Sequence, residues 1–199
     1  MSKSKKEQLI VKPSAENLAS AAQKAAKKEP PPVHLWNPPF CGDLDMEIRR
    51  DGTWFYLGTP IGREALVRLF ASILRKEGNE YFLVTPVEKV RIRVQDAPFV
   101  AVDATVSGSG RDQTITFLTN VGDEVTAGPE NPIRVERDPE TGEPSPYVHV
   151  RRGLEALIDR KTFYRLVEIG SHEMHEGERW FGLWSRGVFF PIIPSAELG

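Results

Sequence analysis

Four side chains suited to ligand binding gather around one predicted turn. Asp51-Gly52 is typical of a two-residue hairpin loop. Such a loop places Arg49 opposite Trp54, and it places Glu47 opposite Tyr56. Alternate residues of a strand share a face, so these four side chains point away from the core. The core-facing side carries Met46, Ile48, Phe55 and Leu57. An arginine over an indole, beside a carboxylate and a phenol, is predicted to form a wall for an anionic or planar ligand.

A structural interpretation of the same residues stays open. Residues 36–40 read as an extended strip that carries Trp36 and Phe40. A tryptophan on a strand is usually buried by something. Trp54 could therefore pack beneath one of these rings, with Arg49 covering it. In that case the hairpin stabilises the fold and binds no ligand.

A second polar face is predicted on the strand before residues 96–98. Lys89, Arg91 and Arg93 occupy alternate positions there. A three-residue loop at 96–98 aligns the apolar residues of two neighbouring strands and places Arg91 opposite Asp103, a favourable cross-strand pair. This face is suited to a phosphate or carboxylate. The alternative is an ordinary solvated charged face.

Other chemistry finds little support in the sequence. His172 and His175 lie three residues apart, in a predicted loop, whereas helical zinc sites of the metalloproteases need histidines four apart. Cys41 has no base placed to activate it. The chain has no phosphate loop, nucleophile elbow or dinucleotide fingerprint. We therefore expect no catalytic residue, no metal and no cofactor.

Composition predicts a globular protein of the cytoplasm. The chain has 199 residues, of which 40% are hydrophobic and 27% charged, as in ordinary globular domains. No apolar run approaches the roughly 18 residues of a membrane span, so no membrane partner is expected. The single cysteine excludes an internal disulfide and fits a reducing compartment.

Charge is unevenly distributed along the chain. Residues 1–28 hold seven lysines and two glutamates, although the whole chain has a net charge of −2. Ser14 is a candidate N-cap for an alanine-rich helix in this segment. Its apolar stripe is only Leu18 and alanines, which predicts a fraying, solvated helix. Binding of nucleic acid or anionic lipid by this arm has little support, because the arm lacks aromatic side chains.

The sequence predicts several strands and two main helices. Thr59-Pro60 resembles a helix start and Gly78 a helix stop. Asp159 is a candidate cap for the second helix, and Gly170 a candidate stop. The other predicted elements are strands at 45–50, 53–57, 80–85, 87–95 and 113–119, a flexible tip at 107–110, and one short strand at 133–137 within a loop region at 120–146.

An internal repeat joins the middle and the end of the chain. Residues 61–70 align without gaps to residues 158–167, with an isoleucine, two arginines and a leucine in common. Residues 78–84 likewise match 177–183. The repeat predicts two related strand-turn-helix-strand units in an α+β, antiparallel β-rich, β-roll-like fold. The predicted organisation is a basic flexible arm and proline linker at 1–32, a first unit at 33–96 and a second unit at 97–199.

Three runs of sequence resemble a bacterial protein family known as domain of unknown function 1285. They are residues 42–54 (GDLDMEIRRDGTW), 81–90 (YFLVTPVEKV) and 95–103 (QDAPFVAVD). The resemblance extends from about Pro39 to Pro191. It implies a two-domain, β-rich α+β fold with repeated motifs and a link to signal transduction. It implies no activity and no catalytic residues.

These observations predict a binding or regulatory protein whose partner is a small molecule or another protein. The predicted site is a cleft between the two units, lined by Arg49, Trp54, Arg91 and Asp103. The alternative is a small enzyme in which Asp103 acts as a base in the same cleft. The apolar residues 180–193 are predicted to form the core of the second unit or, where they exceed it, a homodimer surface.

Overall fold

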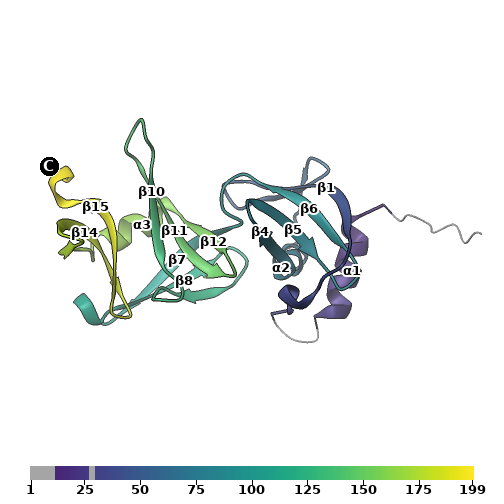
Figure 1. The fold of residues 1–199 in the computed structure, drawn as a ribbon, viewed down its shortest axis with the longest axis horizontal. Helices are drawn as coiled ribbons and strands as arrows, with labels where there is room; N and C mark the ends of the chain where they lie inside the picture. Colours follow the sequence, from purple (N-terminus) through teal and green to yellow (C-terminus); the bar gives the residue numbers. More distant parts are fainter. Residues whose placement is uncertain (1–11, 27–29) are drawn as a thin grey trace, which may run out of the picture.

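The computed structural model describes residues 12–26 and 30–199. It contains two units side by side along the long axis, with α1 near one end and the C-terminus at the other (Figure 1). Each unit has a six-stranded sheet with one main helix. This confirms the predicted α+β, β-rich fold with two related units.

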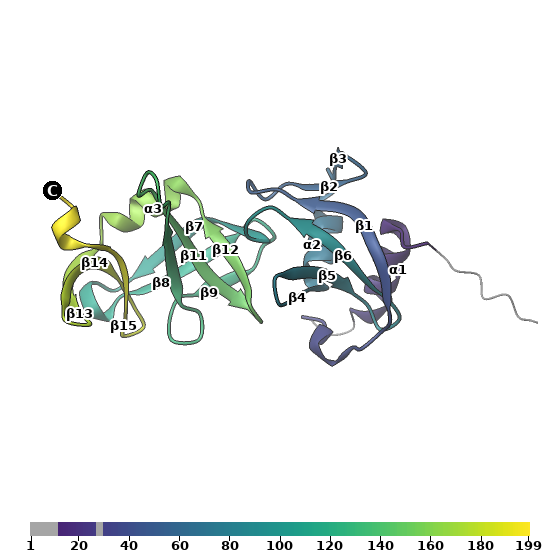
Figure 2. The same ribbon diagram turned by 45° about the horizontal axis from the view of Figure 1, so that its top comes forward.

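The first unit is a mostly antiparallel sheet covered by a helix. Its sheet has the order β3-β2-β1-β6-β5-β4, and only β1 and β6 pair in parallel. The helix α2 covers one face of this sheet (Figure 2), and α1 packs against α2. The elements are α1 (Ala15–Ala25), η1 (Val33–Leu35), β1 (Phe40–Ile48), β2 (Trp54–Tyr56), β3 (Thr59–Pro60), α2 (Glu64–Ser72), β4 (Leu74–Glu77), β5 (Glu80–Val84) and β6 (Lys89–Val94).

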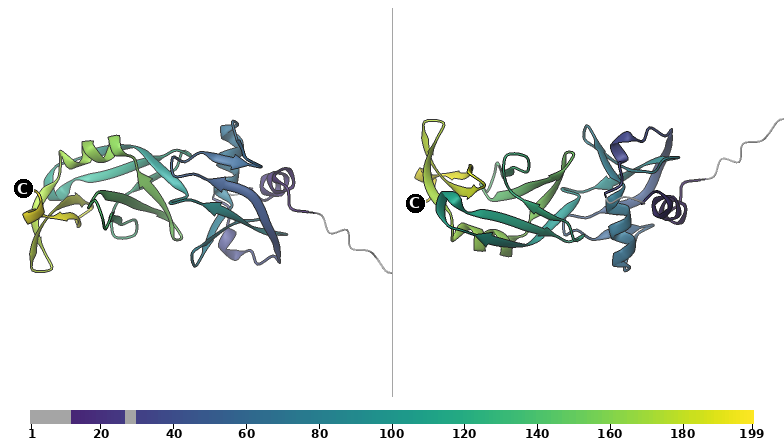
Figure 3. Two further views of the ribbon diagram at one scale, coloured as in Figure 1. Left: turned by 90° about the horizontal axis from the view of Figure 1, so that it is seen from above. Right: turned by 90° about the horizontal axis from the view of Figure 1, so that it is seen from below.

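The second unit has two sheets. The larger has the order β10-β11-β12-β7-β8-β9, and the smaller, β13-β14-β15, lies at the far end beside the C-terminus (Figure 3). The elements are β7 (Phe99–Ser107), η2 (Gly110–Asp112), β8 (Thr114–Thr119), β9 (Glu124–Thr126), β10 (Ile133–Arg137), β11 (Pro144–Arg151), β12 (Leu154–Ile158), α3 (Arg160–Val167), β13 (Ser171–His175), β14 (Glu178–Ser185), β15 (Val188–Pro194) and η3 (Ser195–Glu197).

The repeat found in the sequence corresponds to a repeated structure. Each of α2 and α3 follows a hairpin and precedes a three-stranded antiparallel meander, β4-β5-β6 or β13-β14-β15. In the first unit the last strand of the meander joins the hairpin strand β1. In the second unit β11 is the counterpart of β1, and β10 pairs with it on the edge where a strand of the meander would lie. The second meander therefore forms a sheet of its own.

The predicted register of the first hairpin is wrong by one residue. Ile48 pairs with Trp54 and Met46 with Tyr56, because the loop has three residues, 50–52, instead of two. Arg49 N–H donates to Thr53 O at 2.9 Å and closes this loop. A shift of one residue moves a side chain to the other face of a strand. Trp54 and Tyr56 are thus on the opposite face from Glu47 and Arg49.

The predicted pairing across residues 96–98 is also wrong. β6 and β7 do not pair, because β6 lies in the sheet of the first unit and β7 lies beside β12 and β8 in the second. The segment is therefore the connection between the units and not a hairpin loop. Arg91 and Asp103 consequently belong to different sheets.

Helix boundaries differ from the sequence prediction in the first unit. Thr59-Pro60 forms β3, and α2 begins only at Glu64. The helix ends at Ser72, and Gly78 instead occupies the turn between β4 and β5 with a φ of +59°. In the second unit Asp159 caps α3 as predicted, since its Oδ1 accepts from Thr162 N–H at 2.8 Å.

The N-terminal helix is packed and not solvated. Ser14 Oγ caps α1 as predicted, accepting from Asn17 N–H at 3.2 Å. Leu18 and Ala22 are fully buried, because small side chains let α1 approach α2 closely. The rest of the predicted basic arm, at residues 1–11 and 27–29, lies outside the described residues.

Candidate functional site

A pocket of about 580 Å³ lies between the two units. It is lined on one side by α2 and the segment before η1, and on the other by the β8–β9 turn and the end of β11. The first unit contributes Pro30, Pro31, Arg68, Ala71 and Ser72, and the second contributes Val121, Gly122, Asp123, Glu124, Val150 and Arg151. Its volume is within the range of small-molecule sites.

Polar contacts at the tip of the β1–β2 hairpin hold the two units together. Arg50 Nη1 lies 2.8 Å from Asp96 Oδ2 in the connecting segment, and Arg50 Nη2 donates to Ser145 Oγ at 3.3 Å. Tyr147 O–H donates to Asp96 Oδ1 at 2.8 Å. Burial and this hydrogen bond raise the pKa of Tyr147 to about 12. Asn120 of the second unit also donates to the Gly52 carbonyl at 3.3 Å.

Arg151 lines the pocket and is already engaged in contacts with both units. Its Nη1 lies 2.5 Å from Asp123 Oδ2 within the second unit. Its Nη2 donates to the carbonyl oxygen of Ala71, near the end of α2, at 3.0 Å. The guanidinium also lies 5.1 Å from the ring centroid of Phe99. Arg151 therefore links the units and leaves little capacity to bind a ligand.

Arg68 presents a second guanidinium to the pocket from α2. It lies against the β8–β9 turn, with its Cζ 3.6 Å from the position that a Cβ on Gly122 would take. Arg68 is exposed, and among residues 12–26 and 30–199 its guanidinium has no carboxylate within 4.0 Å and no hydrogen-bond acceptor. It is thus a positive charge at the boundary of the units that has no acidic partner in the described part of the chain.

The internal repeat allows Arg68 to be compared with its counterpart in the second unit. Arg165 occupies the matching position of the second unit, where it lies 2.8 Å from Asp103 Oδ1 and donates to Ala104 O at 2.6 Å. One arginine of the repeated pair is therefore satisfied within its own unit. The other, Arg68, instead faces the pocket.

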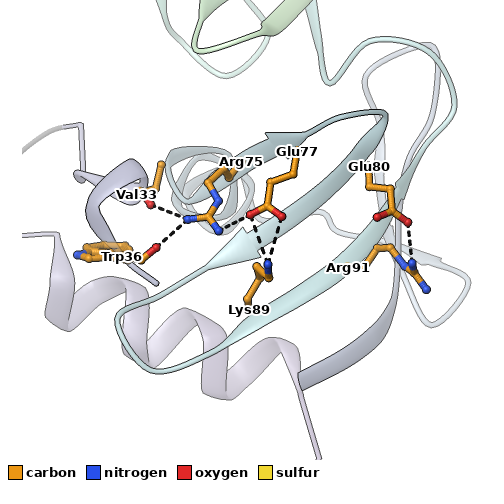
Figure 4. Close-up of polar contacts among 7 residues, drawn as sticks. All are labelled: Val33, Trp36, Arg75, Glu77, Glu80, Lys89 and Arg91. Carbon is orange, nitrogen blue, oxygen red and sulfur yellow. Dashed lines mark hydrogen bonds and ion pairs between the residues drawn. The ribbon is translucent and has the colours of Figure 1, made fainter. Parts of the chain in front are cut away.

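Arg75 holds η1, the short helix that follows the pocket-lining residues Pro30 and Pro31. Its Nη1 donates to the carbonyl oxygens of Val33 at 3.1 Å and Trp36 at 2.8 Å. Its Nη2 pairs with Glu77, which in turn pairs with Lys89 (Figure 4). Burial raises the pKa of Glu77, but the hydrogen bonds from these two cations outweigh it and lower that pKa below its ordinary value. The network ties η1, close to Pro30 and Pro31, to β4.

We expect Arg75→Ala to lower the free energy of unfolding by about 1–3 kcal/mol, because it removes the guanidinium from which the carbonyl groups of Val33 and Trp36 accept hydrogen bonds. Arg93→Ala is the matched control. Arg93 is 59% exposed and pairs with Asp45 at 2.7 Å, and exposed pairs contribute only about 0–1 kcal/mol. Urea unfolding of both variants measures the difference. Equal losses would contradict this role of Arg75.

The predicted basic face of β6 is present, and its charges are neutralised. Arg91 pairs with Asp43 at 2.7 Å and with Glu80 at 2.6 Å, as Figure 4 shows for Glu80. The bond from Arg91 lowers the pKa of Asp43. Arg93 pairs with Asp45 on β1. This arrangement agrees with the alternative interpretation of the sequence, an ordinary solvated charged face. Ligand binding by Arg91 and Arg93 stays a prediction.

The predicted binding wall on the first hairpin is divided by the corrected register. Arg49 lies 3.7 Å from the ring centroid of Phe55 and 3.4 Å from Glu47. Trp54 lies on the other face, 1% exposed and stacked on Phe70 at 6.3 Å between ring centroids. Tyr56 shares this inner face and is half-buried. The quartet therefore does not form one surface.

Asp103 is placed poorly for a catalytic base. The hydrogen bond from Arg165 lowers its pKa below the ordinary value, and its side chain is 55% exposed. It does not line the pocket between the units. A general base needs a pKa near the working pH. The hydrogen bond from Arg165 and the exposure of the side chain both favour the charged carboxylate, so neither raises the pKa of Asp103 toward that range.

The histidine pair and the cysteine considered in the sequence lie apart from the pocket between the units. His172 and His175 lie on the strand β13, not in a loop as predicted, and His172 Nδ1 is 2.7 Å from Ser195 Oγ. No group of three or more His, Cys, Asp or Glu is arranged to hold a metal within the described ranges. Cys41 is exposed. No described helix is both long and apolar enough to cross a membrane.

A second groove of about 890 Å³ lies on α3 and β12, and Arg50 and Asp51 at the tip of the β1–β2 hairpin also line it. Phe163 and Tyr164 contribute apolar surface to it. Its charged residues are already engaged: Arg160 pairs with Glu143, and Asp159 caps α3. The groove therefore offers fewer free charges than the pocket between the units.

Sequence reasoning missed the residues that line the pocket. Arg68 was visible only as one of two arginines conserved between the repeats, and nothing in its neighbours indicates that it meets the β8–β9 turn. Of the residues predicted to line a cleft between the units (Arg49, Trp54, Arg91 and Asp103), none lines this pocket.

Comparisons with known proteins identify two matching family models. The "Domain of unknown function (DUF1285), N-terminal domain" matches residues 31–97. The "Protein of unknown function (DUF1285), C-terminal domain" matches residues 98–192. No curated protein matches the chain.

Two crystal structures are similar to the chain. A DUF1285 family protein from Silicibacter pomeroyi DSS-3 is 64% identical, with a TM-score of 0.83, over 91% of this chain and 97% of that one. A DUF1285 family protein from Shewanella baltica OS155 is 32% identical, with a TM-score of 0.49, over 63% of this chain and 91% of that one.

Proposed function

Because the chain belongs to the DUF1285 family, whose description names no activity, we propose its function from the geometry of the pocket. The protein is a cytoplasmic bacterial binding protein that holds a small anionic molecule between its two units. The ligand contacts both units and so regulates how firmly they are joined.

The unpaired guanidinium of Arg68 carries this proposal. Arginine binds carboxylates and phosphates through a planar fork of N–H donors. In the second unit the matching Arg165 has such a partner in Asp103, whereas Arg68 has none among the described residues. An anionic ligand in the pocket would give Arg68 the partner that its counterpart finds within the protein.

The position of the pocket supports a regulatory role. Its lining comes from both units, and interfaces between domains commonly allow relative motion. A ligand that contacts both units binds best to one arrangement of them, so binding shifts the population toward that arrangement. This interpretation keeps the predicted link to signal transduction as a proposal.

The alternative hypothesis, a small enzyme with Asp103 as its base, has less support. The pKa of Asp103 is lowered by Arg165, and the residue lies outside the pocket.

The apolar run at 180–193 forms most of β14 and β15, where Leu183, Phe190 and Ile192 are buried in the core. No specific observation adds support for a homodimer, which stays a prediction.

The proposal is tested by thermal shift and calorimetry on the full chain. The probes are inorganic phosphate, monocarboxylic and dicarboxylic acids, amino acids and nucleoside monophosphates. At least one class is expected to raise the unfolding midpoint. Arg68→Ala is expected to weaken its binding about 10- to 100-fold, because a charge-assisted hydrogen bond contributes about 1.5–3 kcal/mol.

Arg165→Ala is the matched control, because it removes the equivalent arginine of the repeat outside the pocket. This variant is expected to bind the probe as the parent does. The proposal fails if no anion binds the parent protein, or if Arg68→Ala binds as tightly as the parent.

A further inference from the structure

We propose that the ligand is amphoteric, carrying a cationic group as well as an anionic one, and that Glu124 binds the cationic group. This inference rests on the proposed function, since it concerns the same pocket. The class it identifies comprises free amino acids, short peptides and other zwitterions of similar size.

The charges of the pocket lead to this class. The lining contains two arginines, Arg68 and Arg151, and two carboxylates, Asp123 and Glu124. Arg151 and Asp123 neutralise each other at 2.5 Å. The charges that remain are Arg68 and Glu124, which are both exposed and for which no ion pair is present within residues 12–26 and 30–199.

The two remaining charges come from different units. Arg68 is on α2, whereas Glu124 is the first residue of β9, opposite Leu118 of β8. Both line the pocket, yet no nitrogen–oxygen pair between them is within 4.0 Å. The pocket thus presents a positive group from one unit and a negative group from the other.

An anion without a cationic group fits this arrangement less well. Its charge would be attracted by Arg68 and repelled by Glu124, and interactions of like charge at short range oppose binding. A zwitterion places its carboxylate at Arg68 and its ammonium at Glu124, so both protein charges gain a partner. Ala71, Val121 and Val150 provide apolar lining for its remaining atoms.

The experiment compares matched ligands on the full chain by titration calorimetry. The probes are the common α-amino acids and the dipeptide Gly-Gly. Each is compared with its N-acetyl derivative, which keeps the carboxylate and loses the ammonium. The best free amine is expected to bind about tenfold more tightly than its N-acetyl form, corresponding to one charge-assisted hydrogen bond.

Glu124→Gln is expected to remove this preference, bringing the free and N-acetyl forms to similar affinity. Arg68→Ala is expected to weaken binding of both forms. Glu130→Gln, an exposed glutamate outside the pocket lining, is the control and should keep the preference.

The outcomes separate this inference from the proposed function. If N-acetyl forms and simple acids bind the parent protein as tightly as free amines, the inference is wrong and the anion site stands. A preference that survives Glu124→Gln also overturns the inference. If no acid of any kind binds, the proposed function and this inference both fail.

Discussion

Trp54→Ala is expected to lower the unfolding midpoint by about 10 °C, whereas Phe55→Ala is expected to lower it by only a few degrees. Trp54 is 1% exposed and stacks on Phe70 inside the first unit. Truncating a buried tryptophan costs about 3–5 kcal/mol, and each kcal/mol corresponds to roughly 2–4 °C in a protein of this size. Phe55 is only half-buried, under the guanidinium of Arg49.

This pair of variants also tests the register of the first hairpin. With a two-residue loop, Phe55 would face the core and Trp54 the solvent, and the order of the two losses would be reversed. Differential scanning calorimetry measures both midpoints. Trp54→Phe refines the result: the indole Nε1 is buried without a partner among the described residues. Removing it offsets part of the loss of ring volume, so a small decrease is expected.

Gly182→Ala is expected to disrupt the small sheet of the second unit. A Cβ at this position would lie 2.2 Å from the backbone carbonyl oxygen of Phe190 and 2.7 Å from Cζ of Phe189. The residue lies at an irregularity in the pairing of β14 with β15. Since a backbone atom cannot move aside as a flexible side chain can, we expect a loss of several kcal/mol, at or above the ~1–3 kcal/mol of ordinary overpacking.

Gly62→Ala provides the control for this substitution. A Cβ on Gly62 meets nothing within 4 Å, and its φ lies outside the left-handed region. Its unfolding midpoint should match the parent within a degree or two. Near-ultraviolet circular dichroism follows Trp180 and Trp184 on β14, whose signal should change only in Gly182→Ala. Equal midpoints for the two glycine variants would contradict the close approach of β14 and β15.

The repeated units could be predicted because their signals are local and redundant. The amphipathic patterns of α2 and α3 align without gaps, and Asp159 has the side chain and spacing of an N-cap. Strand β10 (Ile133–Arg137) is likewise where its apolar residues between proline-rich loops indicate. In each case neighbouring residues alone determine the element.

The first hairpin was mispredicted because an Asp-Gly pair fits two kinds of loop. Only Gly52 has a positive φ there, which is typical of a three-residue loop that ends in a left-handed glycine. Two-residue loops, with positive φ at both positions, occur elsewhere in the chain without an Asp-Gly pair. They are Leu57-Gly58, Arg152-Gly153, Glu176-Gly177 and Arg186-Gly187.

The candidate site could not be predicted because its contacts join residues far apart in the sequence. Arg68 meets the turn at Gly122, and Arg151 donates to the carbonyl of Ala71. The apolar alternation of β6 and β7 fits a hairpin as well as it fits two separate sheets. Only the assembled units decide between these arrangements.

The parallel pairing of β1 with β6 has a consequence for how the protein acquires its structure. The sheet of the first unit is complete only when β6, its last strand in the sequence, pairs with β1. Such non-local pairing slows folding. During synthesis this unit therefore stays open until residue 94 has emerged. Because β12 pairs with β7 in the same parallel manner, the second unit repeats that delay, and each half matures as a separate cooperative step.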